Sequence, residues 1–315
     1  GGKRMKGSHG PCSDLTVTML ENVPLAPLTT LKIGGNARWL VRPSGVKGLS
    51  RYCRTCPGDL PRFILGGGSN LLVDDNGFHG VVVDLTHTLN AIVVEHQDAH
   101  GGILRVEAGA ATRKTAHVAR QNGLAGLAFM AGIPGTIGGA LRMNAGAYGC
   151  DVKGVLLDAQ LMDATGNLHT RNAQELGLAY RHCDLPKGWI FVSARFHLAR
   201  GESEAIKSQM RDYNHKRTQA QPLRYPSAGS VFRNPAGAAA WQLIDAAGLR
   251  GHRIGDAQIS EKHSNFFVNL GAASSLHMEE LIELARNRVA QHSGVQLTLE
   301  IGILTPQGLR TEPGR

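Results

Sequence analysis

The sequence predicts a mixed α/β or α+β fold of two or three packed units rather than a helical bundle. The first observation is length, because 315 residues exceed the roughly 100–200 residues of a usual single domain. The second is the alternation of short, strand-like apolar runs with a few helical patterns. The third is that the 40 glycines, about twice the ordinary ~7% share, cluster between those apolar runs.

Strand patterns dominate the first third of the chain. Short apolar runs bounded by turn residues predict strands, and these runs are Ala37–Val41, Phe63–Leu65, Val81–Leu85, Ile92–Glu95 and Leu104–Glu107. Thr112 then predicts a helix N-cap, because its hydroxyl can accept a hydrogen bond from the first helical turn. The predicted helix ends near Asn122, since Gly123 favours a helix stop.

The rest of the chain continues with strands and then becomes more helical. Strands are predicted over 155–162, 189–198, 266–270 and 297–304, and helices over 202–217, 238–247 and 278–292. Pro222 and Pro226 interrupt the pattern after the first of these helices, so we place a domain boundary near residues 200–220. In the last strand, alternation puts Glu300 on the face opposite four apolar residues, Leu297, Leu299, Ile301 and Ile303.

Composition and charge favour a soluble globular protein that binds small anions. Hydrophobic residues make up 42% and charged residues 19%, which allows a sizeable core. No run approaches the ~20 apolar residues of a membrane helix, and Gly1–Ser13 lacks the apolar core of a secretory signal. The net charge of +9 and the pI of about 9.6 favour anionic partners. Because basic residues are scattered and aromatics make up only 5%, nucleic-acid binding is the less favoured alternative.

The cysteines indicate ordinary thiols in a reducing compartment, and they are Cys12, Cys53, Cys56, Cys150 and Cys183. Cys53 and Cys56 form a lone C-x-x-C, which leaves open a redox role or half of a zinc site. No second C-x-x-C or H-x-x-x-H completes such a site, so no metal is expected. We therefore expect a cytoplasmic protein.

The first of two glycine-rich loops follows an apolar strand. It contains Gly66, Gly67 and Gly68, which let an anion approach the main chain without a Cβ in the way. Successive N–H groups in such a turn form an anion-binding nest, and Ser69 and Asn70 add side-chain donors. A tight turn or a bulge is the alternative interpretation.

The second loop, Gly132–Gly139, places four glycines around a Pro-Gly turn. No Lys-Ser/Thr follows it, which excludes a P-loop, and it is not a G-x-G-x-x-G within a βαβ unit, which excludes the Rossmann fingerprint. Two such loops in one chain favour contact with the phosphate groups of a cofactor over two unrelated turns.

Three motifs together resemble one enzyme family. They are Leu28-Thr-Thr-Leu-Lys-Ile-Gly-Gly35, Ile64-Leu-Gly-Gly-Gly-Ser-Asn-Leu-Leu-Val73 and Ala131-Gly-Ile-Pro-Gly-Thr-Ile-Gly-Gly-Ala140. In this order they are similar to motifs of UDP-N-acetylenolpyruvoylglucosamine reductase, the MurB family, from about residue 22 to 304. The resemblance implies NADPH- and FAD-dependent reduction of the enolpyruvyl ether to UDP-N-acetylmuramate. This step belongs to cytoplasmic peptidoglycan synthesis, and thus to cell wall biogenesis, cell shape and cell division.

The resemblance also implies an α+β fold, with a two-subdomain FAD-binding fold of the vanillyl-alcohol-oxidase type and a C-terminal α+β substrate-binding domain. The implied divisions are a flexible tail at 1–14, FAD-binding subdomain 1 at 15–88, FAD-binding subdomain 2 at 89–205, the substrate-binding domain at 206–305 and a tail at 306–315. The residues implied to hold non-covalent FAD are Gly66, Gly67, Gly68, Ser69, Asn70, Gly132, Ile133, Pro134, Gly135, Thr136, Gly138, Gly139 and Asn144. We expect a monomer that binds a UDP-sugar and NADPH, and neither nucleic acid nor a membrane.

Three residues match the family's catalytic positions. Ser230, in Pro226-Ser-Ala-Gly-Ser-Val-Phe-Arg-Asn-Pro235, is implied to donate a proton; a turn serine is the alternative, and Ser227 is the internal comparison. Arg181, in Tyr180-Arg-His-Cys-Asp184, is implied to stabilise developing negative charge; a surface ion pair is the alternative. Glu300 resembles the glutamate that helps polarise the substrate's carboxylate, and a solvated sheet face is the alternative.

Asn234 and His263 stand at positions similar to the family's substrate contacts. Cys183 replaces the usual serine of the arginine motif, and the absence of a tyrosine-bearing insertion indicates the shorter subtype. The alternative function is a flavin-dependent oxidase of the same fold that acts on an alcohol or lactone. Such an oxidase would lack the set formed by Arg181, Ser230 and Glu300.

Overall fold

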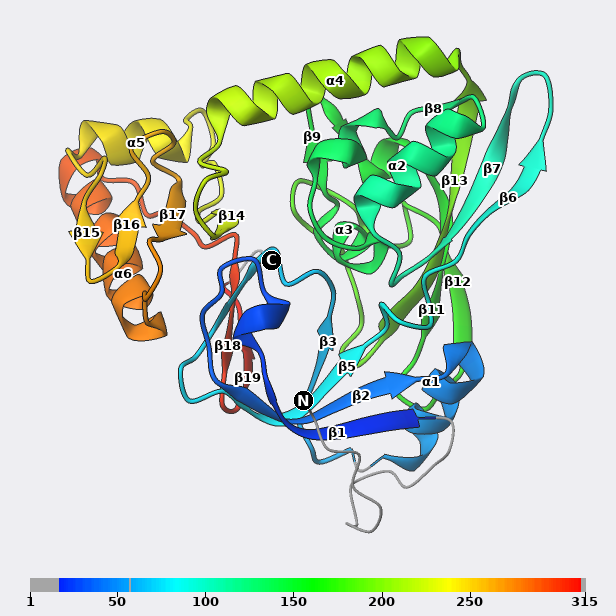
Figure 1. Cartoon of the computed structure of the whole chain (residues 1–315), viewed down its shortest axis with the longest axis horizontal. Helices are drawn as coiled ribbons and strands as arrows, with labels where there is room; N and C mark the ends of the chain where they lie inside the picture. The colour runs from blue at the N-terminus through cyan, green and yellow to red at the C-terminus, as the bar shows by residue number, and fades with distance from the viewer. Residues whose placement is uncertain (1–16, 57, 313–315) are drawn as a thin grey trace.

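Three groups of elements make up the fold, and helix α4 (Ser203–Ala220) joins two of them along one edge of the molecule (Figure 1). The structure, a computed structural model, describes residues 17–56 and 58–312, so the tail predicted at 1–14 lies outside it. We call the three groups subdomain 1, subdomain 2 and the third domain. None of the described helices is long and apolar enough to cross a membrane.

Subdomain 1 is a four-stranded sheet flanked by η1 (Ala26–Leu28) and α1 (Gly45–Thr55). Its strand order is β1-β2-β5-β3, formed by Val17–Pro24, Asn36–Pro43, Phe78–Asp84 and Arg62–Leu65. Strands β2, β5 and β3 run parallel, so their carboxyl ends lie on one edge, where ligands commonly bind. The first glycine-rich loop begins at this edge, directly after β3.

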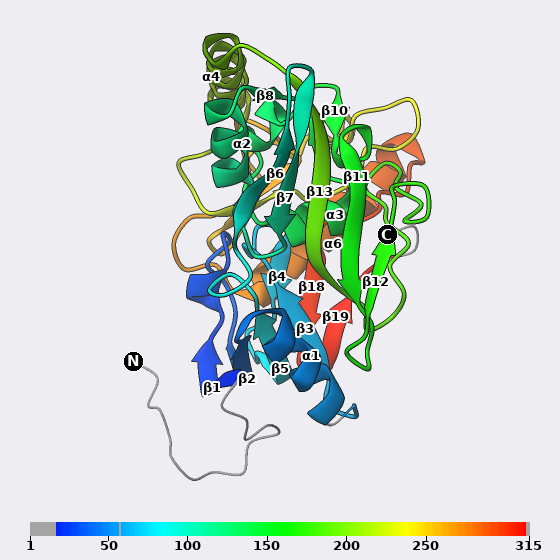
Figure 2. The same cartoon turned by 90° about the vertical axis from the view of Figure 1, so that its right-hand side faces the viewer.

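Subdomain 2 is a six-stranded antiparallel sheet with the order β12-β11-β13-β7-β6, and β8 pairs with β13. Figure 2 shows the long strand β13 near the middle of this sheet. The strands are β6 (Ile92–Gln97), β7 (Gly101–Glu107), β8 (Leu124–Ala125), β11 (Leu156–Met162), β12 (Leu168–Arg171) and β13 (Ile190–Arg200). The other elements are α2 (Thr112–Gln121), η2 (Ala128–Gly132), α3 (Ile137–Met143), η3 (Val152–Gly154) and the pair β9 (Gly146–Ala147) and β10 (Cys150–Asp151). The second glycine-rich loop therefore connects η2 to α3.

The third domain packs a sheet of order β14-β17-β16-β15 against two helices, α5 (Ala240–Ala246) and α6 (Ser275–Ser293). Its strands are Ser227–Ser230, Phe266–Asn269, Ala257–Ile259 and Arg253–Ile254. In its core, Phe232 and Phe267 meet edge to face with ring centroids 6.0 Å apart. The same buried cluster includes Leu31, Ile33 and Leu72 of subdomain 1, so the two units share one apolar core.

The last strands return to subdomain 1. Strand β18 (Gly302–Thr305) pairs in parallel with β4 (Leu71–Val73) and antiparallel with β19 (Gly308–Arg310). The tail predicted at 306–315 is therefore wrong at β19, because backbone hydrogen bonds of a hairpin hold these residues in a sheet. The four apolar residues predicted to share a face, Leu297, Leu299, Ile301 and Ile303, all lie in the core of the third domain.

Most helices agree with the sequence. Those predicted at 112–122, 202–217, 238–247 and 278–292 are confirmed as α2, α4, α5 and α6. Thr112 is not the N-cap, however, because Ala111 takes that position and the Thr112 hydroxyl donates to the Ile133 carbonyl at 2.5 Å. The sequence does not predict α1 and α3, since glycines within them lower the helix propensity.

Among the cysteines that the structure describes, which exclude Cys12, one differs from the expected set of ordinary thiols. Cys53, Cys150 and Cys183 are free, but Cys56 is disulfide-bonded. Its partner is not Cys53, so the C-x-x-C is not a redox pair of its own. Sequence spacing does not show which cysteines meet in space. Within the described ranges, no group of three or more His, Cys, Asp and Glu residues is arranged to hold a metal ion.

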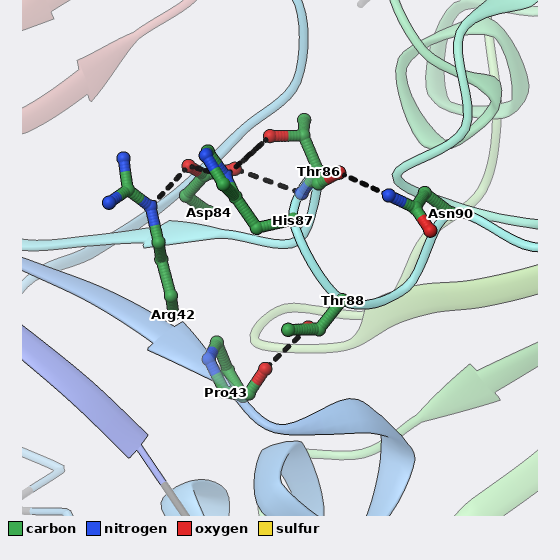
Figure 3. A network of polar contacts seen from close by, with 7 residues as sticks. All are labelled: Arg42, Pro43, Asp84, Thr86, His87, Thr88 and Asn90. Atoms are coloured by element: carbon green, nitrogen blue, oxygen red, sulfur yellow. Dashed lines mark hydrogen bonds and ion pairs between the residues drawn. The ribbon is translucent and has the colours of Figure 1, made fainter.

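A buried carboxylate fixes the connection between subdomains 1 and 2 (Figure 3). Asp84, at the end of β5, accepts hydrogen bonds from Arg42 Nε at 3.0 Å and from Thr86 Oγ1 at 2.6 Å. His87 Nδ1 lies 3.1 Å from the same carboxylate, and Thr88 Oγ1 donates to the last carbonyl of β2 at 2.5 Å. Burial acts to raise the pKa of Asp84, but hydrogen bonds from Thr86 and Arg42 outweigh it, so the pKa lies below its ordinary value.

Candidate functional site

The two glycine-rich loops lie against each other. A Cβ on Gly67 would lie only 2.6 Å from the Gly135 Cα, which no larger residue tolerates without a backbone shift. The Ser69 hydroxyl also donates to the Pro134 carbonyl at 3.3 Å. The loops of subdomains 1 and 2 therefore form a single feature at the junction of the two units.

The backbone of the first loop is suited to an anion. Within residues 17–56 and 58–312, the N–H groups of Gly67, Gly68 and Ser69 donate to no protein acceptor. Gly68 has a φ of +61°, and the Leu28 carbonyl stands where its Cβ would be. Consecutive N–H groups at a glycine of positive φ make a concave site for phosphate oxygens. The anion nest predicted from the sequence is thus compatible with the loop geometry.

The second loop is stabilised by its own hydrogen bonds and has free space on its accessible side. Thr136 caps α3 by accepting a hydrogen bond from Gly139 N at 3.4 Å. A Cβ on Gly132 or Gly139 would meet nothing closer than 3.7 Å. At Gly132 that nearest atom is Cδ of Arg217, which comes from α4 and brings a positive charge to the loop. The accessible side of this loop therefore suits an anionic ligand.

Two asparagines predicted to hold the cofactor make contacts within the protein. Asn70 Nδ2 donates to the Glu300 carbonyl at 3.2 Å, so its side chain is directed at the C-terminal segment. Asn144 is only 1% exposed, and its Nδ2 donates to the Ala179 carbonyl at 2.9 Å while its Oδ1 accepts from Lys153 N. Asn144 thereby anchors the segment that leads to Arg181. Cofactor contact by either side chain stays a prediction.

Arg181 lies in a tight turn of subdomain 2 and reaches the C-terminal segment. Its Nε donates to Glu300 Oε1 at 2.9 Å, and its Nη2 donates to the Gly146 carbonyl at 3.2 Å. Its guanidinium also lies 5.1 Å from the centre of the Tyr180 ring. The two charged side chains are 23% and 14% exposed, so their charge–charge attraction is less screened than on an open surface. The sequence alternatives of a surface ion pair and a solvated face do not describe this pair.

Glu300 is joined through its backbone to the residue that follows Ser230. Ser230 ends β14 and pairs with Phe266, while the Glu300 N–H donates to the carbonyl of the next residue, Val231, at 2.8 Å. Since the Glu300 side chain holds Arg181, the structure brings all three predicted catalytic residues to one junction. They come from three distant segments of the sequence.

The two serines of β14 differ in their hydrogen bonds. The Ser227 hydroxyl accepts from Gly229 N at 3.4 Å, as a turn serine does. In the part of the chain that the structure describes, the Ser230 hydroxyl makes no hydrogen bond and is half-buried. Ser230 is therefore free to donate to a ligand, whereas Ser227 satisfies its own turn.

The two predicted substrate residues flank the junction on the third domain. His263 lies between the rings of Phe266, at 4.8 Å, and Trp241, at 6.4 Å, and its Nδ1 accepts from Asn265 N. Burial lowers the pKa of His263, which favours the neutral imidazole. The side-chain oxygen of Asn234 accepts from the N–H at the start of α5, so its amide nitrogen is the group left for a ligand.

Sequence reasoning missed two residues of the junction. Arg233 donates to the Arg181 carbonyl at 2.9 Å, and the Tyr180 hydroxyl accepts from Asn234 N at 3.4 Å. Both stand next to predicted residues in the two motifs, and this adjacency is the only sequence signal. The Cys183 thiol lies buried behind the turn, and burial raises its pKa to about 11, so it stays neutral.

Comparison with known proteins shows the family to which the chain belongs. Residues 37–172 match the family model described as FAD binding domain, and residues 221–304 match that of UDP-N-acetylenolpyruvoylglucosamine reductase, C-terminal domain. The reductase of that name from Paramagnetospirillum magneticum is 43% identical over 283 residues, which cover 90% of this chain and 91% of the relative. The chain belongs to the UDP-N-acetylenolpyruvoylglucosamine reductase family.

Two further comparisons extend this result. The family's reductase from Gluconobacter oxydans is 44% identical over 298 residues, with 94% of this chain and 96% of the relative covered. The crystal structure of UDP-N-acetylenolpyruvylglucosamine reductase (MurB) from Thermus caldophilus superposes with a TM-score of 0.78 at 34% identity, over 91% of this chain and 98% of that one. The predicted fold class, an α+β FAD-binding fold followed by a further α+β domain, is confirmed.

Proposed function

We propose that this protein reduces the enolpyruvyl ether of UDP-N-acetylenolpyruvoylglucosamine to UDP-N-acetylmuramate with FAD and NADPH. The observation that carries the proposal is the Arg181–Glu300 ion pair of 2.9 Å, formed across the subdomain 2–third domain boundary beside Ser230. A reductase of a conjugated enol ether needs a cation near the substrate's carboxylate and a proton donor near its α-carbon. This junction offers both, and family membership supports the substrate.

The two glycine-rich loops are the site for FAD. The N–H groups of Gly67, Gly68 and Ser69 and the open side of Gly132–Gly139 fit the pyrophosphate, while Asn70 and Asn144 act by shaping the surrounding chain. When bound, FAD supplies the hydride for the β-carbon after receiving one from NADPH. The protein's own task is then to orient the substrate and to stabilise charge.

Arg181 is the group that stabilises the enolate. A guanidinium keeps its charge at any physiological pH and binds a carboxylate with two parallel hydrogen bonds. In the structure its Nε donates to Glu300 and its Nη2 donates to a backbone carbonyl. These two hydrogen bonds fix one edge of the guanidinium and thereby the direction of its other edge. Glu300 thus holds Arg181 in place beside the substrate's carboxylate.

Ser230 is the proton donor to the α-carbon. A hydroxyl is a weak acid, so it acts only on a strongly basic partner such as an enolate held close to it. Its position one residue before the carbonyl that binds Glu300 N fixes it near the ion pair. The absence of a hydrogen bond to the Ser230 hydroxyl among the described residues is consistent with this role.

Asn234 and His263 contact the sugar nucleotide, and Arg217 and its neighbours on α4 provide positive charge for the phosphates. The enzyme acts as a monomer in cytoplasmic peptidoglycan synthesis, and thereby in cell shape and division. The cytoplasmic location rests on the family's reaction rather than on the cysteines, because Cys56 is disulfide-bonded.

One anaerobic experiment tests the proposal. The purified protein should show the absorption bands of bound flavin, and NADPH should bleach them. Addition of UDP-N-acetylenolpyruvoylglucosamine should then restore the oxidised spectrum without oxygen, with UDP-N-acetylmuramate formed in equal amount. A bleached flavin that the sugar nucleotide does not reoxidise would refute the proposal, and oxidation of an alcohol or lactone with oxygen consumption would favour the oxidase.

A further inference from the structure

Arg181 occupies a backbone position that most side chains avoid. Ala179 and His182 exchange two backbone hydrogen bonds of 3.1 and 3.0 Å, so Tyr180 and Arg181 form the corner of a β-turn. Arg181 has a φ of +48°. A positive φ at the third position of a β-turn favours glycine and is uncommon for an ordinary side chain. Such a conformation persists where surrounding contacts hold it, often at functional sites.

Arg233 holds the backbone of this turn from the third domain. Its Nη2 donates to the Arg181 carbonyl at 2.9 Å, and the neighbouring Asn234 N–H donates to the Tyr180 hydroxyl at 3.4 Å. The Arg181 guanidinium is held separately, by Glu300 at 2.9 Å. From the third domain, the turn is thus held at its main chain by Arg233 and at its charged end by Glu300.

The base of Arg233 is rigid. Its own N–H donates to the Thr298 carbonyl at 2.9 Å, which ties it to the segment that carries Glu300. The buried amide of Asn265 accepts from Phe232 N at 3.0 Å and donates to Phe232 O at 2.9 Å. Because this segment is held firmly, the Arg233 side chain has a fixed base from which it can hold Arg181 in place.

We propose that Arg233 is a positioning residue, which holds Arg181 in its left-handed conformation and so aims the guanidinium at the substrate's carboxylate beside Ser230 and Glu300. The inference rests on the proposed role of Arg181 in substrate reduction. Without the hydrogen bond to its carbonyl, Arg181 relaxes toward a negative φ, and its guanidinium leaves Glu300. Hydride transfer to the substrate then loses a preorganised positive charge.

The test compares three variants by stopped-flow spectroscopy. Arg233→Ala should slow reoxidation of reduced flavin by the sugar nucleotide roughly 10- to 100-fold, the usual effect of a small misplacement of a reacting group. Flavin content and flavin reduction by NADPH should not change. Arg233→Lys should recover most of the rate, because a single N–H donor reaches the carbonyl. Arg253→Ala is the matched control, since the polar contacts of this exposed arginine with described residues lie within its own hairpin.

Two further measurements separate positioning from general support. In an Arg181→Ala background, Arg233→Ala should add almost no further loss of rate, because both changes remove the same interaction. A crystal structure of Arg233→Ala should show Arg181 with a negative φ or with its guanidinium away from Glu300. If Arg233→Ala does not hold flavin, Arg233→Met, which keeps the apolar stem, is compared in the same way.

The outcomes are distinct. Three results would overturn the positioning role alone. They are additive rate losses in the double variant, no recovery of the rate in Arg233→Lys, and reoxidation of Arg233→Ala as fast as that of the wild type. Fast reoxidation by Arg181→Ala would overturn the proposed role of Arg181, and this inference with it.

Discussion

The third domain meets the other two units through contacts of opposite character. Against subdomain 1 the contact is built around a shared apolar core, in which Leu31, Ile33 and Leu72 pack among the residues of the third domain. Against subdomain 2 the contact beside the site is polar, with the Arg181–Glu300 pair and the Arg233 hydrogen bond to the Arg181 carbonyl. Helix α4 connects the two units on the other side.

This difference indicates that one contact stabilises the folded protein and the other aligns the residues of the site. Apolar burial is non-directional and proportional to area, so the contact with subdomain 1 stabilises the assembly without specifying angles. Hydrogen bonds between charged groups depend on distance and direction, so the contact with subdomain 2 aligns reactive groups. We expect variants on the apolar side to change the free energy of unfolding, and variants on the polar side to change rates.

The largest expected effect lies on the polar side, at Ser230. Ser230→Ala should slow reoxidation of reduced flavin by the sugar nucleotide about 10²- to 10⁴-fold, the usual contribution of a general acid. Reduction by NADPH should stay nearly unchanged, because no proton to the substrate's carbon is needed in that step. Single-turnover stopped-flow measurements of the two half-reactions provide the comparison.

The matched control for this change is Ser227→Ala, three residues earlier in the same strand. Its hydroxyl accepts a hydrogen bond from the nearby Gly229 N, as a turn serine does, so the reoxidation rate should stay close to that of the wild type. Equal losses in both half-reactions of Ser230→Ala would show that Ser230 supports the flavin site and is not the proton donor.

On the apolar side, Leu72→Ala tests the shared core. Leu72 is fully buried on β4 and lies opposite Ile303 of β18, so its truncation leaves a cavity. The free energy of unfolding should fall by about 3 kcal/mol, measured by urea denaturation. The reoxidation rate of the folded variant should hardly change. Leu157→Ala, on an exposed strand position of subdomain 2, should leave both quantities nearly unchanged, and a large rate loss in Leu72→Ala would contradict the separation.

The sequence predicts the elements of the apolar contact better than those of the polar one. Alternation in 297–304 correctly places four residues in the core, Leu297, Leu299, Ile301 and Ile303, because the period of a strand dictates which side chains are buried. The alternation also predicts a single strand over 297–304. The strand that the structure describes begins at Gly302, because the residues before it form an isolated bridge, between Leu299 and Phe232, and no longer ladder. Pairing partners across the chain are not encoded in local periodicity.

The site shows the same limit. Two glycine-rich loops are visible in the sequence, but their contact at Gly67 and Gly135 depends on how the sheets pack. The motif around Arg181 identifies the residue and does not reveal its positive φ or the carbonyl contact from Arg233. These features arise from segments far apart in the sequence, where no local propensity applies. The resemblance to the family identifies the residues of the site, and the structure shows which of them contact one another.

The connection between subdomains 1 and 2 sharpens the comparison, because its polar contacts at Asp84 lie beside an apolar core that both units share and should act on stability. Asp84 is 4% exposed and is held by Arg42 and Thr86, with a pKa below its ordinary value. Asp84→Asn removes the charge from these hydrogen bonds, so the free energy of unfolding at neutral pH should fall by about 1–2 kcal/mol. Urea denaturation between pH 7 and pH 3 measures the difference between wild type and variant.

The sign of the pH dependence follows from the lowered pKa of Asp84. The carboxylate contributes stability that is fully present above the unfolded-state pKa of about 3.9 and is lost as the pH falls through the lower folded-state pKa. The advantage of the wild type over Asp84→Asn should therefore be largest at neutral pH and shrink below about pH 4. Asp212→Asn is the control, because among the described residues this exposed carboxylate forms an ion pair with Lys216 on its own helix, and such pairs contribute little. An advantage that grows as the pH falls would show that Asp84 is not stabilised as a carboxylate. Polar contacts at this boundary would then not fix the two subdomains by charge.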